Sequence, residues 1–282
     1  MSAAETALEA DWLGVCRRVV VGLRTMLHNH PTTRERAVEL GRGQGGDQSL
    51  VIDEAAEEII FAELDELYRQ GHRFAAISEE RGEADYGDGR VRVVIDPIDG
   101  SMNAKRGLVH HAVSLAVADG ETMADVAFGY VYDFGPGEEW WARRGEGAYL
   151  SGRPLRDPPA ERRTKDDKLE LLAVESADPR WLAAQANELV EVAHRLRAIG
   201  SIAISMCQVA CTRVDGMVTL WRCRAVDAAA AQLIVRESGG RVAFTAYDDP
   251  LAAPLDVRPH SPVVAARTDQ SLELLRGVPM RD

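Results

Sequence analysis

Two carboxylates three residues apart, at the end of an apolar segment, constrain this 282-residue chain most. Asp96 and Asp99 follow residues 91–95, whose valines and isoleucine predict a β-strand. Gly100 and Ser101 then predict a tight turn into a helix. Two like charges this close repel unless a cation neutralises them. Because the N–H groups at a helix start bind phosphate and carboxylates bind divalent cations, this segment predicts a phosphate bound through metal ions.

The charge and hydropathy of the chain exclude two classes of partner. Its formal net charge is −12, whereas nucleic acids and anionic membranes are bound by a surplus of basic surface. No apolar run approaches the roughly 18 residues that span a bilayer, and the acidic N-terminus lacks the basic region of a signal peptide. We therefore expect a cytoplasmic protein that binds neither nucleic acid nor membrane.

The predicted elements divide the chain at a charged segment. Helices are predicted at 6–28, 53–70, 180–195, 201–213 and 227–238, and strands at 91–96, 111–118, 125–132, 140–150 and 170–175. Residues 156–168 are charged, contain proline and have no periodicity. They predict a seam between an N-terminal half of about 1–155 and a C-terminal half of about 169–282, within a single domain of residues 1–282.

Acids stand at the ends of predicted elements in four separate places: Asp53, Glu79-Glu80, Asp96 with Asp99, and Asp227. Hard divalent cations take oxygen ligands, and Mg²⁺ prefers carboxylates, carbonyls and water to histidine. Taken singly, Asp53 and Asp227 fit helix N-caps equally well, and the glutamate pair fits a solvated turn. Only the pair after residues 91–95 favours a metal on its own.

A second phosphatase chemistry also places acids after a strand. Haloacid-dehalogenase-type enzymes carry an Asp-x-Asp-Gly-Thr-like order and form an aspartyl-phosphate. In this chain the second acid lies three residues after the first, which changes its direction. A helix and a Glu-Glu turn also precede the motif. Both observations disfavour the aspartyl-phosphate chemistry.

The motifs together resemble those of the inositol monophosphatase superfamily, and most closely its archaeal-type inositol monophosphatase/fructose-1,6-bisphosphatases. The segment from Asp96 to Asn103 resembles the family's Asp-Pro-Ile/Leu-Asp-Gly-Thr-x-Asn. Downstream, Asp227 leads into Glu237-Ser238-Gly239-Gly240, similar to the family's second motif. Three further matches are Ser78-Glu79-Glu80, the acidic pair Asp47 and Asp53, and the turn at 145–154. The resemblance covers residues from about 46 to 240.

This resemblance implies an α/β fold, a layered α-β-α-β-α sandwich of the sugar phosphatase type, usually as a homodimer and often sensitive to lithium. It implies two or three Mg²⁺ ions, with Mn²⁺ as an alternative, on Glu79, Asp96, the carbonyl of Ile98, Asp99 and Asp227. Asp53 and Ser101 would act on the attacking water, with Ser101 relaying a proton to Asp53. The substrate would be bound by Gly100, Ser101, Gly200, Ser201, Ile202 and Ala203.

The implied activity is the Mg²⁺-dependent hydrolysis of a small phosphorylated polyol or sugar, with inositol monophosphate and fructose 1,6-bisphosphate as leading candidates. Three departures bear on the substrate. Ser101 replaces the usual threonine and keeps its hydroxyl, and Arg224 lies three residues before Asp227, as in the archaeal-type branch. Leu220 stands where inositol-preferring enzymes commonly carry a glutamate, which weakens the case for inositol. Histidinol phosphate, a phosphoadenosine nucleotide and a non-catalytic phosphate-binding role stay open.

Overall fold

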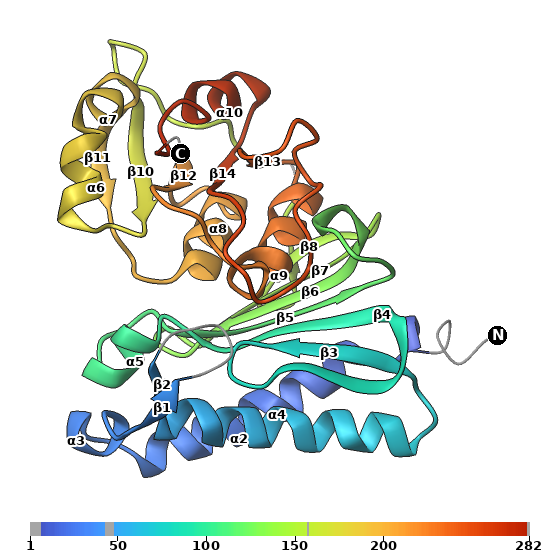
Figure 1. The fold of residues 1–282 in the computed structure, drawn as a ribbon. Coiled ribbons are helices and arrows are strands. Elements are labelled where there is room, and N and C mark those ends of the chain that lie inside the picture. The colour runs from blue at the N-terminus through green and yellow to red at the C-terminus, as the bar shows by residue number, and fades with distance from the viewer. Residues whose placement is uncertain (1–6, 43–47, 157, 281–282) are drawn as a thin grey trace.

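The chain is built of five layers in the order helix, sheet, helix, sheet, helix (Figure 1). A computed structural model describes residues 7–42, 48–156 and 158–280, with only the backbone described at 39–42 and 48–49. This arrangement confirms the predicted α-β-α-β-α sandwich. The predicted acid Asp47 lies outside the described residues.

The first sheet has seven strands in the described part of the chain, which follow one another in chain order. They are β3 (Phe74–Ser78), β4 (Gly82–Asp99), β5 (Ala112–Ala118), β6 (Val126–Asp133), β7 (Glu138–Arg143), β8 (Gly147–Leu150) and β9 (Arg153–Pro154). The strands predicted at 91–96, 111–118 and 125–132 are confirmed, but β4 begins nine residues earlier than expected. The segment predicted at 140–150 forms two strands, β7 and β8, separated by a turn at 144–146. Ala75 pairs with both Asp85 and Arg92, so two parts of β4 pair with β3. The first part is polar and lacks the apolar pattern that predicts a strand.

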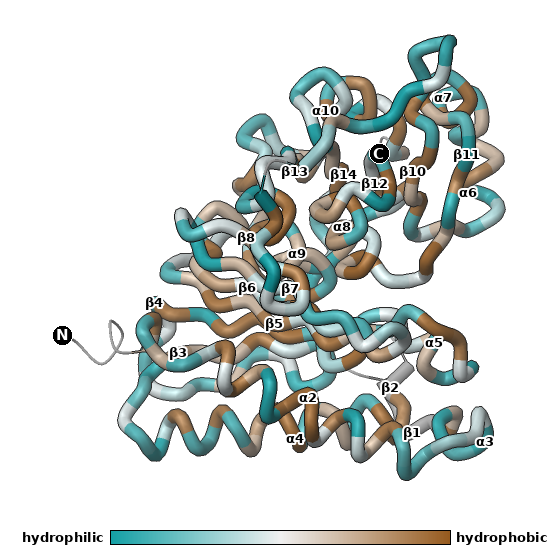
Figure 2. The backbone as a smooth tube through the Cα atoms, turned by 180° about the vertical axis from the view of Figure 1, so that it is seen from behind, coloured by the Kyte–Doolittle hydropathy of each residue, from teal (hydrophilic) through white to brown (hydrophobic). Residues whose placement is uncertain are grey.

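Two long helices cover the outer face of this sheet, α2 (Trp12–Asn29) and α4 (Val51–Arg69) (Figure 1). Figure 2 shows hydrophobic and hydrophilic residues alternating along both helices, as expected when one face packs on a sheet. Beside them lie α3 (Thr33–Arg36), β1 (Glu39–Arg42) and β2 (Gln48–Leu50). Helix α4 begins two residues before Asp53, so the prediction of Asp53 as N-cap is wrong. Its side chain reaches back to the N–H of Leu50, the N-cap residue.

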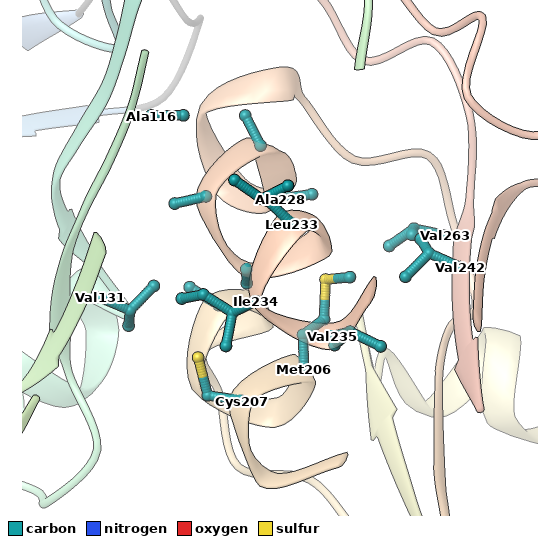
Figure 3. Packing of buried hydrophobic residues seen from close by; sticks show 14 of the residues in the cluster. Ala116, Val131, Met206, Cys207, Ala228, Leu233, Ile234, Val235, Val242 and Val263 are labelled. Atoms are coloured by element: carbon teal, nitrogen blue, oxygen red, sulfur yellow. The ribbon is translucent and has the colours of Figure 1, made fainter. Parts of the chain in front are cut away.

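The middle layer consists of α8 (Ile202–Ala210) and α9 (Ala225–Glu237). Every residue of α9 from Ala225 to Val235 is buried, because the helix has a sheet on either side. In Figure 3 its side chains lie between Val131 of the first sheet and Val242 and Val263 of the second. Alanine and glycine allow close contact here: a Cβ on Gly129 of β6 would lie 2.5 Å from the carbonyl oxygen of Ala230.

The second sheet has five strands within the described residues, in the order β11 (Ala193–Arg197), β10 (Leu169–Glu175), β12 (Gly216–Thr219), β14 (Val263–Ala266) and β13 (Arg241–Phe244). Its outer face is covered by α6 (Pro179–Ala184), α7 (Ala186–Val192) and α10 (Asp269–Leu275). The helix predicted at 180–195 is wrong at its end, since residues 193–197 pair with β10. The helix predicted at 201–213 ends earlier, at Ala210.

The described helices include none that is long and apolar enough to cross a membrane. Residues 158–168 lead from the first sheet to the second, and Arg163 forms an isolated bridge with Leu169. The division of the chain into two halves at this segment stays a prediction.

Candidate active site

Three carboxylates from distant parts of the sequence converge where the first sheet meets α9. Glu79 lies in the turn after β3, Asp96 lies near the end of β4, and Asp227 is the third residue of α9. One carboxylate oxygen from each lies within 4.8 Å of the other two. The prediction of Asp227 as an N-cap is wrong, because α9 begins at Ala225. Its carboxylate instead accepts a hydrogen bond from the N–H of Arg224, the N-cap residue, at 2.8 Å.

Burial makes it unfavourable for these acids to be ionised. It raises the pKa of Asp96 well above its ordinary value, and the charges of Glu79, Asp99 and Asp227 raise it further. Burial also raises the pKa of Glu79 to about 8, although the guanidinium of Arg224 opposes the change. A divalent cation would reverse these effects, since an opposite charge favours the ionised form of a carboxyl. The residues therefore fit a hard divalent metal ion with oxygen ligands.

Asp99 lies outside the group of three and is held by α8. Its Oδ2 accepts hydrogen bonds from the hydroxyl of Ser201 at 2.5 Å and from the N–H of Ala203 at 2.7 Å. Burial raises the pKa of Asp99 to about 7 in spite of these bonds. Two of the residues predicted to contact substrate, Ser201 and Ala203, therefore bind Asp99 in this structure.

Asp53 keeps one carboxylate oxygen available. Its Oδ2 accepts the hydrogen bond from Leu50 at 3.0 Å, whereas its buried Oδ1 has no hydrogen-bond partner among the described residues. Burial raises the pKa of Asp53 to about 7. Ser101 is exposed, and no hydrogen bond joins it to Asp53 in the described part of the chain. The open acceptor fits a water molecule or a metal ion, but the predicted contact with Ser101 is absent.

A glycine turn joins β4 to the short helix α5 (Ser101–Arg106). Gly100 adopts a left-handed conformation, with φ of 85°. A Cβ there would also lie 2.9 Å from the carbonyl oxygen of Gly200, so glycine is required for two reasons. The side-chain amide of Asn103 donates to the carbonyl oxygens of His110 and Ile199, at 2.9 and 2.8 Å. These bonds tie the turn to the segment that precedes α8.

A cavity of about 650 Å³ lies beside these residues. Seven of the predicted site residues line it, namely Asp99, Gly100, Ser101, Gly200, Ser201, Ile202 and Asp227. Trp181 and Trp221 also line it and stack on each other, with ring centroids 5.3 Å apart and an interplanar angle of 15°. The structure thus brings the turn, two of the acids and the start of α8 to one cavity. The other five predicted site residues do not line it, namely Asp53, Glu79, Asp96, Ile98 and Ala203.

Sequence reasoning missed Glu175, at the end of β10. It is 3% exposed and accepts hydrogen bonds from the N–H groups of Ile199 and Gly200 and from the hydroxyl of Ser205, at 2.9, 3.0 and 2.6 Å. Glu175 therefore fixes the segment whose next residue, Ser201, holds Asp99. The sequence pattern could have identified Glu175, because this acid ends a predicted strand just as Asp96 does.

The contacts of Arg224 were also missed. Its Nη1 lies 2.6 Å from Oε1 of Glu79, and its Nη2 lies 3.0 Å from Oδ1 of Asp227. Burial lowers the pKa of Arg224, but the charges of Asp227, Glu79 and Asp96 outweigh burial, so the pKa is raised. A permanent positive charge thus lies against two of the three convergent acids.

A five-layered sandwich with convergent carboxylates beside a glycine turn and a cavity defines a metal-dependent phosphatase. The sequence profile of the inositol monophosphatase family matches residues 19–277. The chain therefore belongs to the inositol monophosphatase family, and with it to the phosphoric monoester hydrolases.

Several known proteins are similar to this chain. It is 35% identical over 213 residues to the Nus factor SuhB of Haemophilus influenzae, covering 74% of this chain and 76% of that protein. It is 30% identical over 237 residues to the fructose-1,6-bisphosphatase/inositol-1-monophosphatase of Archaeoglobus fulgidus, covering 83% and 84%. The crystal structure of the suppressor protein suhB of Bartonella henselae has the same fold, with a TM-score of 0.78 and 23% identity over 95% of this chain and 98% of that one.

Proposed function

We propose that this protein hydrolyses a small phosphorylated polyol or sugar with Mg²⁺ as its cofactor, and that inositol monophosphate and fructose 1,6-bisphosphate are the first substrates to test. The observation that carries the proposal is the convergence of Glu79, Asp96 and Asp227 next to the cavity that contains the glycine turn. The name of the Archaeoglobus relative, which combines these two activities, supports the choice of substrates.

The metal would be held by oxygen donors alone. We expect two or three Mg²⁺ ions, with Mn²⁺ as an alternative, on Glu79, Asp96, Asp99, Asp227 and the carbonyl of Ile98. When bound, the metal cancels charge on the phosphate dianion and lowers the pKa of the attacking water. Oδ2 of Asp99 already accepts hydrogen bonds from Ser201 and Ala203, so Asp99 would share its carboxylate between the metal and the start of α8.

The chain's own groups would orient the reactants. The open Oδ1 of Asp53 would accept a proton from the attacking water. To pass that proton, the hydroxyl of Ser101, which makes no hydrogen bond to Asp53 within the described residues, would have to turn toward it when substrate binds. The N–H groups of Gly100 and Ser101 would donate to phosphate oxygens. Gly200, Ser201 and Ile202 would contact the rest of the substrate.

One observation favours a second group of substrates. The stacked Trp181 and Trp221 form part of the cavity wall, and an indole binds a planar ring by offset stacking. Histidinol phosphate and a phosphoadenosine nucleotide carry such a ring, whereas inositol and fructose carry hydroxyls. Leu220, which precedes Trp221, is fully buried in the outer core and does not line the cavity, so it supplies no group that would bind a hydroxyl.

The test is phosphate release from all four substrates, with Mg²⁺ and with EDTA. We expect release from at least one substrate that stops with EDTA and returns when Mg²⁺ is restored. Glu170→Gln, on the exposed side of β10, serves as the control variant and should behave like the wild type. If no substrate yields Mg²⁺-dependent phosphate, the enzymatic proposal fails. The homodimer and the cytoplasmic location stay predictions.

A further inference from the structure

The candidate metal centre contains a positive charge of its own. Arg224 ion-pairs with two of the three acids that converge there, while the third, Asp96, is buried beside them. The site residues are partly or fully withdrawn from solvent: the side chains of Arg224, Glu79 and Asp227 are 15%, 14% and 9% exposed. The Coulomb attraction between charges is larger in such a place than on the surface, and withdrawing the charges from water offsets part of it.

The guanidinium of Arg224 donates hydrogen bonds from all three of its nitrogens. Nη1 donates to Glu79, and Nη2 and Nε donate to Oδ1 of Asp227 at 3.0 and 3.3 Å. The backbone N–H of the same residue donates to Oδ2 of Asp227. A planar, permanently charged fork therefore occupies lone pairs that a metal ion would use.

We propose that Arg224 is a resident counter-ion of the metal centre, which holds Glu79 and Asp227 in position without metal and competes with Mg²⁺ for their oxygens. Without a cation, the three acids, which each have an oxygen within 4.8 Å of the other two, would repel one another when ionised and would move apart or take up protons. The arginine prevents this separation. The same contacts must be released, at least in part, before Glu79 and Asp227 can bind an ion.

The released side chain has room to move. Arg224 lines the cavity of about 650 Å³, so its guanidinium can leave Glu79 without displacing the packed core. The competition has a predictable size, because removing one positive charge about 4 Å from a divalent ion strengthens ion binding tenfold or more even at the dielectric constant of water.

A purely structural ion pair makes a different prediction. Arg224 is the N-cap residue of α9 and its N–H is bonded by Asp227, so the residue also helps to begin the helix. If this were its whole role, replacing its side chain would lower stability to the same extent with and without Mg²⁺. It would leave the affinity for Mg²⁺ unchanged or reduce it.

The experiment is calorimetric titration of Mg²⁺ into EDTA-treated, then chelator-free protein, together with thermal unfolding with and without Mg²⁺. We expect Arg224→Gln to bind Mg²⁺ at least tenfold more tightly than the wild type. Its melting temperature without metal should fall, and Mg²⁺ should raise it by more than it raises that of the wild type. Arg224→Lys keeps the charge and should bind Mg²⁺ within about threefold of the wild type.

Arg213→Gln is the matched control, since Arg213 makes a two-pronged ion pair with Glu138 at 2.5 and 2.6 Å outside the metal centre. Its Mg²⁺ affinity should equal that of the wild type. Equal or weaker binding by Arg224→Gln would overturn the inference, as would undetectable binding by every variant. If the glutamine variant does not fold without metal, Arg224→Met, which also removes the charge, takes its place: tenfold tighter binding would support the inference, and equal or weaker binding would overturn it.

The inference rests on the metal centre of the proposed function but not on turnover. A protein whose Mg²⁺ affinity responds as expected, yet which releases no phosphate, would refute the proposed function and leave the role of Arg224 intact. Turnover with an unchanged affinity in Arg224→Gln would do the reverse.

Discussion

Glu175 is a sensitive point of the site, because one buried carboxylate organises the segment that holds Asp99. We consider Glu175→Ala. The change leaves three donors without their acceptor, the N–H groups of Ile199 and Gly200 and the hydroxyl of Ser205. Hydrogen bonds to a charged group contribute about 1.5–3 kcal/mol each. Burial of the carboxylate offsets part of that gain, as the raised pKa of Glu175 indicates. We therefore expect the free energy of unfolding to fall by about 3 kcal/mol.

The assay is urea unfolding of the metal-free protein, followed by tryptophan fluorescence. Glu170→Ala, on the exposed side of the same strand, is the control and should change the free energy by no more than about 0.5 kcal/mol. Glu175→Gln keeps one acceptor oxygen and should lose about half as much as the alanine variant. In the folded fraction of Glu175→Ala, kcat should drop about tenfold, because Ser201 no longer holds Asp99 firmly. If Glu175→Ala unfolds like the control, the carboxylate does not fix this segment and the reasoning is wrong.

Three further predictions concern the acids and the hydroxyl of the site. Asp99→Asn should abolish Mg²⁺-dependent phosphate release while melting close to the wild type, and near-normal turnover would mean that the metal binds elsewhere. Ser101→Ala should lower kcat by about 10²-fold, and an effect on KM alone would limit the hydroxyl to binding. Burial raises the pKa of Asp53 from its ordinary 3.8 to about 7, so the folded metal-free protein holds a proton that the unfolded chain has lost. The resulting stability is fully present below pH 3.8 and is lost as the pH rises through about 7. Urea unfolding should therefore show a fall of up to about 4 kcal/mol over this range, and an equally steep fall in Asp53→Asn would contradict the assignment.

The acids of the site were visible in the sequence because each follows or begins a regular element. Glu79 and Asp96 come after apolar strands, and Asp227 stands at the head of an alanine run that forms α9. Their convergence within 4.8 Å depends on three separate segments meeting, and only the resemblance to a family made it predictable. The orientation of Asp99 was not predictable, since it is set by donors about a hundred residues away in α8.

The errors in the fold have a common physical cause. The first part of β4 and the whole of β11 carry mostly polar, exposed side chains, so an apolar pattern does not mark them. They are strands because their backbones pair with β3 and β10. Pairing of this kind depends on tertiary contacts, which override local propensity. The two N-cap errors have another cause. An aspartate at the cap accepts from N–H groups of the first turn, whereas Asp53 and Asp227, at the third helical position, accept from the N–H of the N-cap residue. An acid near the start of a helix fits either position in the sequence.

The composition of α9 follows from the position of Asp227. Of the convergent acids, Asp96 lies in the first sheet, Glu79 lies in the turn after β3, and Asp227 belongs to this helix. Their spacing therefore depends on how closely the helix approaches the sheet. A Cβ on Gly129 would lie 2.5 Å from the carbonyl oxygen of Ala230, so only glycine allows this close approach. The neighbouring alanines of the helix are also small. Larger apolar side chains would bury more surface and stabilise the middle layer further. They would also move Asp227 away from Asp96. The packing of the middle layer would improve, but the candidate metal centre would lose its geometry.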